Sequence, residues 1–262
     1  MPENDADDLA LLLDAARAAG EIAQRHFGKA PKVWDKGAGL GPVSEADLEI
    51  DAMLRARLLA ARPGHGWLSE ESEDDPARLS AREVFVIDPL DGTRAYLAGQ
   101  KCFAHSLAIV RDGRTRVAVV HLPLLGLTYS ACEGGGALLN DTPLVTPPRK
   151  GLLGARILAS RAQLAPEKWP GGLPPLQHHF RPSLAWRLCL VAAGDFHGMA
   201  TLRDTWDWDI AAATLIATEA GARVSDRHGA AMRFNTPEAL SHGLLAGPEG
   251  VHVGFLRGLG ID

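Results

Sequence analysis

The chain of 262 residues has few cysteines and no long apolar run. Its three cysteines, Cys102, Cys132 and Cys189, lie far apart without CxxC spacing, which argues against a disulfide framework or a structural zinc site. No apolar run approaches the roughly 18 residues of a membrane span, and the first residues are acidic where a signal peptide would be basic. We therefore predict a cytoplasmic protein without a membrane partner.

The sequence also lacks an excess of positive charge. Its formal net charge of -5 argues against a nucleic acid polymer as partner, because such binding uses Lys and Arg to neutralise phosphates. A small phosphorylated ligand stays compatible with this charge if a divalent cation is bound. The motifs HExxH, GxSxG and the Walker loop are absent, which argues against zinc-protease, serine-hydrolase and P-loop chemistry.

What the first half contains is two helical patterns followed by strands. Apolar spacing predicts an amphipathic helix over residues 8–27 and a second helix from residue 44 to just before Pro63. Short runs rich in Val and Ile follow between residues 84 and 131, with the hairpin signal Asp112-Gly113 between two of them. This texture predicts an antiparallel meander in an α+β half, residues 1–145.

The second half alternates between strand and helix. Strands are predicted near Ile157 and Met199, and helices over residues 184–193 and 209–220, the last of them ended by Gly221. We therefore predict an α/β half, residues 146–262, joined to the first by a soft boundary. The composition, 46% hydrophobic and 23% charged, is that of an ordinary globular protein.

The segment most suggestive of chemistry is Asp88-Pro89-Leu90-Asp91-Gly92-Thr93. It follows an apolar strand, and a proline fixes the backbone where the chain leaves the sheet, so that both carboxylates can face one point. Such a pair repels unless a proton or cation lies between, and Mg²⁺ prefers such hard oxygen ligands. Gly92 permits close backbone approach, and free N–H groups at a helix start bind phosphate. An Asx-turn before a capped helix explains the same residues equally well.

Three further acidic residues each have a structural explanation of their own. Glu70 stands in an acidic run that is typical of a solvated loop. Asp209 begins an apolar helical run, where an acid interacts with the helix dipole, and the doubled Trp-Asp leaves Asp207 as an alternative register. Asp47 stands three residues after Ser44, which is the spacing of a capping box.

Four segments in order change this balance, and together they span residues 42 to 221. On them the sequence resembles the inositol monophosphatase family, lithium-sensitive phosphatases that also include 3'(2'),5'-bisphosphate nucleotidases and bacterial histidinol-phosphate phosphatases. The resemblance implies a layered αβαβα sandwich and a homodimer. The segments are Pro42 to Asp47, Leu68 to Ser72, Asp88 to Thr93, and Trp208 to Ala213 with Glu219-Ala220-Gly221.

The resemblance also implies roles for individual residues. It makes Glu70, Asp88, Asp91, Asp209 and the Leu90 carbonyl the ligands of two or three Mg²⁺ ions. Asp47 would hydrogen-bond the hydroxyl of Thr93, and this pair, assisted by Glu70, would orient the attacking water. The Gly92 and Thr93 amides would hold phosphate oxygens. The reaction expected is direct attack by water on a phosphomonoester, without a phosphoaspartate.

The residues after the motif leave the substrate open. Inositol monophosphatases commonly continue with Thr-Asn-Phe, whereas this chain has Arg94-Ala95-Tyr96 after the threonine, which is more like the nucleotidase and histidinol-phosphatase branches. Arg94 is equally well explained as a surface residue. The candidate substrates are inositol monophosphates, 3'-phosphoadenosine 5'-phosphate and histidinol phosphate. A noncatalytic regulator that binds metal and phosphate is the alternative of another class.

Overall fold

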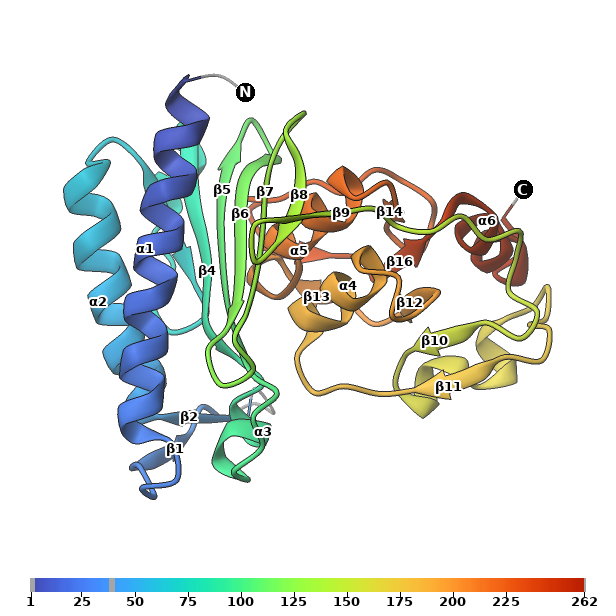
Figure 1. Ribbon diagram of the computed structural model, residues 1–262, viewed down its shortest axis with the longest axis horizontal. Coiled ribbons are helices and arrows are strands. Elements are labelled where there is room, and N and C mark those ends of the chain that lie inside the picture. Colours follow the sequence, from blue (N-terminus) through green and yellow to red (C-terminus); the bar gives the residue numbers. More distant parts are fainter. Residues whose placement is uncertain (1–2, 38–40, 262) are drawn as a thin grey trace.

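The computed structural model describes residues 3–37 and 41–261 and consists of five stacked layers (Figure 1). Helices α1 (Glu3–His26) and α2 (Glu45–Ala61) form the first layer. They cover a seven-stranded sheet in the strand order β3-β4-β5-β6-β7-β8-β9. Its strands are β3 (Gly66–Ser69), β4 (Glu83–Asp91), β5 (Ala104–Arg111), β6 (Arg114–Leu122), β7 (Leu127–Cys132), β8 (Gly136–Leu139) and β9 (Thr142–Leu144).

The other face of this sheet packs against two central helices, α4 (Leu184–Ala192) and α5 (Asp207–Glu219). Beyond them lies a five-stranded sheet in the order β11-β10-β12-β16-β14, and α6 (Glu249–Gly258) covers its outer face (Figure 1). These strands are β10 (Arg156–Leu158), β11 (Gln177–His179), β12 (Gly198–Thr201), β14 (Arg223–Ser225) and β16 (Leu244–Gly247). The predicted αβαβα sandwich is confirmed.

Shorter elements complete the fold. Two small sheets pair β1 (Val33–Asp35) with β2 (Pro42–Ser44), and β13 (Thr205–Trp206) with β15 (Leu240–Ser241). A five-residue helix, α3, runs over Thr93–Leu97 directly after β4. Three single 3-10 turns lie at Pro76–Ser80, Arg161–Leu164 and Pro166–Lys168.

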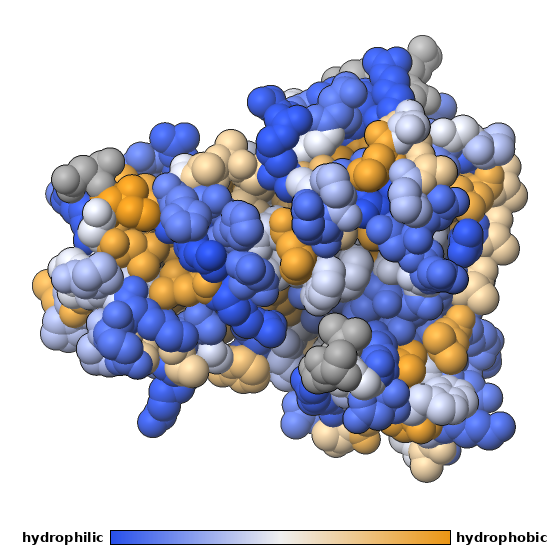
Figure 2. All heavy atoms as spheres, turned by 180° about the vertical axis from the view of Figure 1, so that it is seen from behind, coloured by the Kyte–Doolittle hydropathy of each residue, from blue (hydrophilic) through white to orange (hydrophobic). Residues whose placement is uncertain are grey.

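Three buried apolar clusters lie between the layers and account for their stacking. Leu12 of α1 and Ile50 of α2 meet alternate residues of β4 such as Phe85 and Ile87, whereas Val84 and Val86 point to α5. A strand buried on both faces reads as a continuous apolar run, which is why this segment lacks polar alternation. On the face drawn in Figure 2 hydrophilic side chains predominate, and the hydrophobic ones form small separate groups.

The predicted long helices and the meander are confirmed, with shifts at their ends. Helix α5 begins at Asp207, two residues before the predicted start. The strands of the first sheet end at Leu144 and those of the second begin at Arg156, but α4 and α5 pack against both sheets. The division near residue 145 therefore remains a proposal, and the two parts share one core. Within residues 3–37 and 41–261, no helix has the length and apolarity needed to cross a membrane.

Candidate metal and phosphate site

The acidic cluster begins at the end of β3, beside the last residues of its parallel neighbour β4. Strand β3 pairs with β4 in parallel, with Ser69 opposite Ile87. The next residues, Glu70 just after β3 and Asp88 still within β4, therefore lie side by side at this end of the sheet, and the Glu70 amide donates to the Ile87 carbonyl at 3.2 Å. Adjacent parallel strands present their carboxyl ends together, so this register brings the two acids to one point.

Asp209 reaches the same point through a hydrogen bond between α5 and the sheet. Ser106 of β5 lies opposite Asp88 in the antiparallel register, and its hydroxyl donates to the Trp208 carbonyl at 3.0 Å. This contact places the first turn of α5 over the end of β4. Carboxylate oxygens of Glu70, Asp88 and Asp209 consequently lie within 4.8 Å of one another.

Asp91 is held by the other central helix. The β4–β5 register shifts between Asp88 and Asp91, and this irregularity turns the second aspartate of the motif toward α4. Its carboxylate accepts the Ser183 hydroxyl at 2.7 Å and the Ala185 amide at 2.8 Å, both at the start of α4. Burial, only partly offset by these two hydrogen bonds, raises the pKa of Asp91 to about 6.

The electrostatics of the cluster favour a bound cation. Asp88 is 1% exposed, its Oδ1 accepts the Leu90 amide at 2.9 Å, and its Oδ2 is buried without a hydrogen-bond partner among the described residues. Burial first, and then the neighbouring acids, raise the pKa values of Asp88 and Asp209 well above the usual range. An orphaned carboxylate oxygen facing other carboxylates is the arrangement that a hard divalent cation compensates. The residues present therefore fit Mg²⁺.

A lysine supplies a positive charge at the edge of this cluster. Lys36 Nζ lies 2.7 Å from a carboxylate oxygen of Glu70 and 2.7 Å from one of Glu71. Burial and the Glu70 charge raise the pKa of Glu71 to about 7, although its hydrogen bond to the lysine opposes this. Glu70, the residue that the family resemblance implies as a metal ligand, joins the cluster of three carboxylates.

Asp47 has both of the roles that the sequence allowed. Its Oδ2 accepts the Ser44 amide at 2.9 Å at the start of α2, which is the capping arrangement. Its Oδ1 accepts the Thr93 hydroxyl at 2.9 Å, and that hydroxyl also lies 3.1 Å from the Leu90 carbonyl. Both partners are acceptors, so the hydroxyl uses its proton for them and its oxygen lone pairs stay free to accept a hydrogen bond from a ligand in the cavity.

The turn between β4 and α3 depends on a glycine and a buried histidine. Gly92 has φ +104°, a conformation that other residues adopt only with strain, and it precedes the first turn of α3. The ring of His105, fully buried on β5, lies with Nδ1 2.5 Å from the Pro89 carbonyl. A carbonyl only accepts, so Nδ1 carries the proton, and burial lowers the pKa of this ring to about 3. Neutral His105 thus fixes the backbone of the motif through its hydrogen bond to the Pro89 carbonyl.

Asp207, the alternative register, lies elsewhere. It is fully buried at the start of α5, and its carboxylate accepts the Asn235 amide at 2.7 Å and the Ser241 hydroxyl at 3.3 Å. These bonds fix the loop before β15. The adjacent rings of Trp206 and Trp208 stack with centroids 4.8 Å apart.

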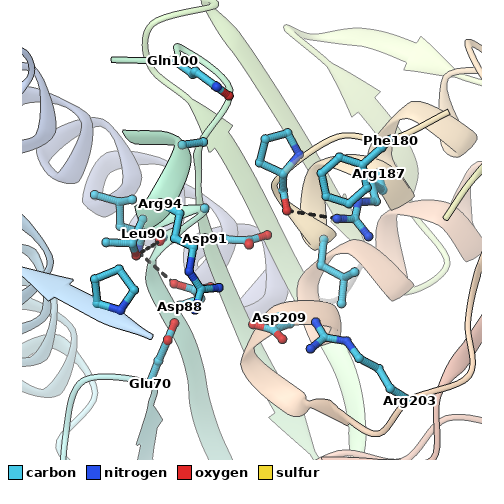
Figure 3. A pocket seen from close by; sticks show the side chains of 16 residues that line it. Glu70, Asp88, Leu90, Asp91, Arg94, Gln100, Phe180, Arg187, Arg203 and Asp209 are labelled. Carbon is cyan, nitrogen blue, oxygen red and sulfur yellow. Dashed lines mark hydrogen bonds between the residues drawn. The ribbon is translucent and has the colours of Figure 1, made fainter. Parts of the chain in front are cut away.

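The cluster lines a cavity of about 450 Å³ whose other wall is basic (Figure 3). Arg94, the residue left open by the sequence, lies in it, together with Arg187 of α4 and Arg203 of the loop after β12. Sequence reasoning missed the latter two, and it missed Lys36. Arg203 stands six residues before Asp209, but no pattern around it, Arg187 or Lys36 marks a basic residue of the site.

Comparison with known proteins agrees with this geometry. A family model described as the inositol monophosphatase family matches residues 5–255. A protein of Rhizobium meliloti named inositol-1-monophosphatase is 35% identical over 84% of this chain and 86% of its own. A protein of Mycobacterium leprae named 3'-phosphoadenosine 5'-phosphate phosphatase is 31% identical, with 87% and 84% covered. The solved extragenic suppressor protein suhB of Bartonella henselae superimposes with a TM-score of 0.83 at 27% identity, over 97% of this chain and 98% of that one.

Fold and site together thus define a phosphoric monoester hydrolase. The chain belongs to the inositol monophosphatase family, as its sequence motifs indicated.

Proposed function

We propose that this enzyme hydrolyses the phosphomonoester of a small metabolite with Mg²⁺ and a directly attacking water. The observation on which the proposal rests is the convergence of Glu70, Asp88 and Asp209 within 4.8 Å. Asp91 and the Leu90 carbonyl, which line the same cavity, complete the proposed ligand set for two or three ions. Bound Mg²⁺ would lower the pKa of a water bound to it. It would also neutralise charge on the phosphate and on the leaving oxygen.

The protein's own groups orient the reactants. Thr93, hydrogen-bonded to Asp47, would hold the attacking water, and Glu70 would accept its proton. The amides of Gly92 and Thr93, at the start of α3, would hold the remaining phosphate oxygens. None of these steps needs a covalent intermediate, so trapping a phosphoaspartate at Asp88 or Asp91 would refute this mechanism.

The proposed substrate panel contains inositol 1-phosphate, 3'-phosphoadenosine 5'-phosphate and histidinol phosphate. Phosphate release should require Mg²⁺, stop with a chelator and be inhibited by Li⁺. Glu70→Gln should lose at least about 100-fold in kcat. Glu73→Gln, an exposed acid of the same loop, is the matched control and should keep full activity.

If the protein is instead a noncatalytic regulator, the opposite result is expected. Protein with confirmed bound metal would then release no phosphate from any of the three compounds. The simultaneous presence of Asp47, Thr93 and the full carboxylate set supports the enzyme, because metal binding alone would not need the Asp47–Thr93 hydrogen bond. The homodimer and the cytoplasmic location stay predictions, and light scattering in solution tests the first.

A further inference from the structure

The wall of the cavity opposite Glu70 and Asp88 is unusually basic. Two arginines line it, Arg187 and Arg203, and a third, Arg94, lines the same cavity from the motif side. In Figure 3, Arg187 and Arg203 enter from the C-terminal half, on the side of Asp209, whereas Arg94 comes from the motif side. Among residues 3–37 and 41–261, no carboxylate lies within 4.0 Å of any of the three guanidinium groups.

Arg187 is built into the wall with part of its guanidinium uncommitted. The residue is 7% exposed and its Cζ lies 4.4 Å from the ring centroid of Phe180. Its Nε donates to the Arg181 carbonyl at 2.5 Å and its Nη2 to the Pro182 carbonyl at 3.2 Å. A guanidinium has five N–H groups, so these bonds fix its plane and leave donors for a ligand.

Arg203 lines the same cavity beside Asp209 (Figure 3) and has no hydrogen bond to the described residues. Structural arginines of this chain look different. Arg78 is buried and donates to the Asp74 carboxylate at 2.5 Å, and Arg227 donates to Asp204 at 2.9 Å. Arg187 and Arg203 therefore differ from those that stabilise the fold, because neither makes an ion pair. The negative charges that act on them are those of site carboxylates, Asp91 and Asp209 for Arg187 and Asp209 for Arg203.

The arginines line the part of the cavity that would receive the leaving alcohol of the substrate. The scissile phosphate belongs beside the carboxylates and the start of α3, so the rest of the cavity receives what the phosphate is attached to. An uncharged polyol needs no cation for recognition, and the ammonium group of histidinol phosphate would be repelled. Arginine pairs best with phosphate, in a bidentate geometry that suits its planar fork.

We propose that Arg187 and Arg203 form a second anion subsite, with Arg94 adding charge, so that the enzyme prefers phosphomonoesters whose alcohol carries a second phosphate. The proposal rests on the phosphatase activity proposed above and narrows its substrate class. The carbon skeleton could be a nucleoside or a sugar, since the shared chemistry is the second phosphate.

Matched substrate pairs test this directly. One pair is adenosine 3'-phosphate and adenosine 3',5'-bisphosphate; the other is glucose 1-phosphate and glucose 1,6-bisphosphate. The bisphosphate of at least one pair should have a kcat/KM about tenfold or more above its partner, mainly through KM. The pair with the larger ratio identifies the skeleton. Equal values within both pairs would overturn the subsite.

Arg203→Gln is the variant of choice, because the side chain is exposed and makes no hydrogen bond that folding needs. It should lower kcat/KM for the preferred bisphosphate about 10- to 100-fold and that of the monophosphate less than about threefold. Arg187→Lys should reduce the same preference by removing the fork while keeping the charge. Arg114→Gln, at the hairpin on the far end of the sheet, should change neither. An equal loss for both substrates would mean that Arg203 only balances the carboxylates, and the proposal would fail.

A binding measurement separates this proposal from the phosphatase assignment. Calorimetry with adenosine 3'-phosphate and its 3',5'-bisphosphate, in Ca²⁺ instead of Mg²⁺, should show tighter binding of the bisphosphate, and Arg203→Gln should remove the difference. If that holds while no phosphomonoester is hydrolysed in Mg²⁺, the subsite stands and the proposed function fails. If hydrolysis occurs and binding shows no preference, the subsite fails alone.

Discussion

Replacing Asp88 by asparagine should make the metal-free protein more stable while removing its activity. Asp88 Oδ1 accepts the Leu90 amide, a bond that the asparagine carbonyl keeps, whereas Oδ2 is an orphan beside other acids. Two unit charges within 4.8 Å of each other repel by about 3.5 kcal/mol or more at an effective dielectric constant near 20. Relaxation and partial protonation reduce this value, so the expected gain in the free energy of unfolding is about 1–3 kcal/mol.

The pH dependence of this gain has a definite sign. The pKa of Asp88 is raised in the folded state by burial and then by Glu70, so its ionisation opposes folding increasingly as the pH rises above the unfolded-state value. Asparagine has no such titration. The advantage of Asp88→Asn in chelator should therefore be larger at pH 8 than at pH 5.

Magnesium should reverse the order of stability. Saturation of the wild type at 100 times its dissociation constant adds about 2.7 kcal/mol, and the variant, lacking a ligand, should gain much less. Urea unfolding in chelator and in Mg²⁺, followed by circular dichroism, measures both differences, with Glu73→Gln expected to stay within about 0.5 kcal/mol. A metal-free Asp88→Asn protein that is less stable than the wild type would instead make Asp88 a structural turn residue.

Three further changes test the support of the site. Thr93→Val should lose about 100-fold or more in kcat, and about 1–3 kcal/mol in unfolding free energy because buried Asp47 loses a donor; Thr93→Ser, which keeps the hydroxyl, should restore most of both. His105→Asn should lessen the loss of stability between pH 6.5 and 3. Burial lowers the pKa of the His105 ring to about 3, so the wild type loses stability as the pH falls below the pKa of the unfolded chain, about 6.5. An unchanged acid transition in urea titrations would contradict this. Gly92→Ala should cost about 1–2 kcal/mol in unfolding free energy, since φ is +104° there while the nearest atom to the new methyl group lies at 3.5 Å, and a neutral result would mean that the turn relaxes.

The sequence was most informative where function and local structure coincide. The hexapeptide from Asp88 to Thr93 and the capping spacing of Asp47 are local features; the structure shows the capping contact and brings Asp88 beside Glu70 and Asp209, whereas the roles assigned to these residues stay predictions. Helices α1 and α2 and the strands β4 to β7 were likewise predictable, because their apolar periodicity reflects burial on one or both faces.

What the sequence could not supply is contact between distant segments. That Glu70 belongs beside Asp88 follows from the parallel register of β3 and β4, and β3 is only four residues long, too short for a period to be read. The start of α5 was placed two residues late because Asp207 is buried by bonds to Asn235 and Ser241, which lie 28 and 34 residues away. Such a bond has no signature in the residues around it.

The two walls of the cavity have separate origins, and this bears on how the substrate can vary. The acidic wall is set by the edge of the first sheet and the first turn of α5, where a shift of one residue would separate the carboxylates. The basic wall comes from Arg187 and Arg203, on α4 and on the loop after β12, outside every motif that defines the family resemblance. Substitutions on that wall leave the ligand set intact. On the functions proposed above, the motifs would fix the chemistry of the site, whereas residues outside the motifs would set the choice of leaving group.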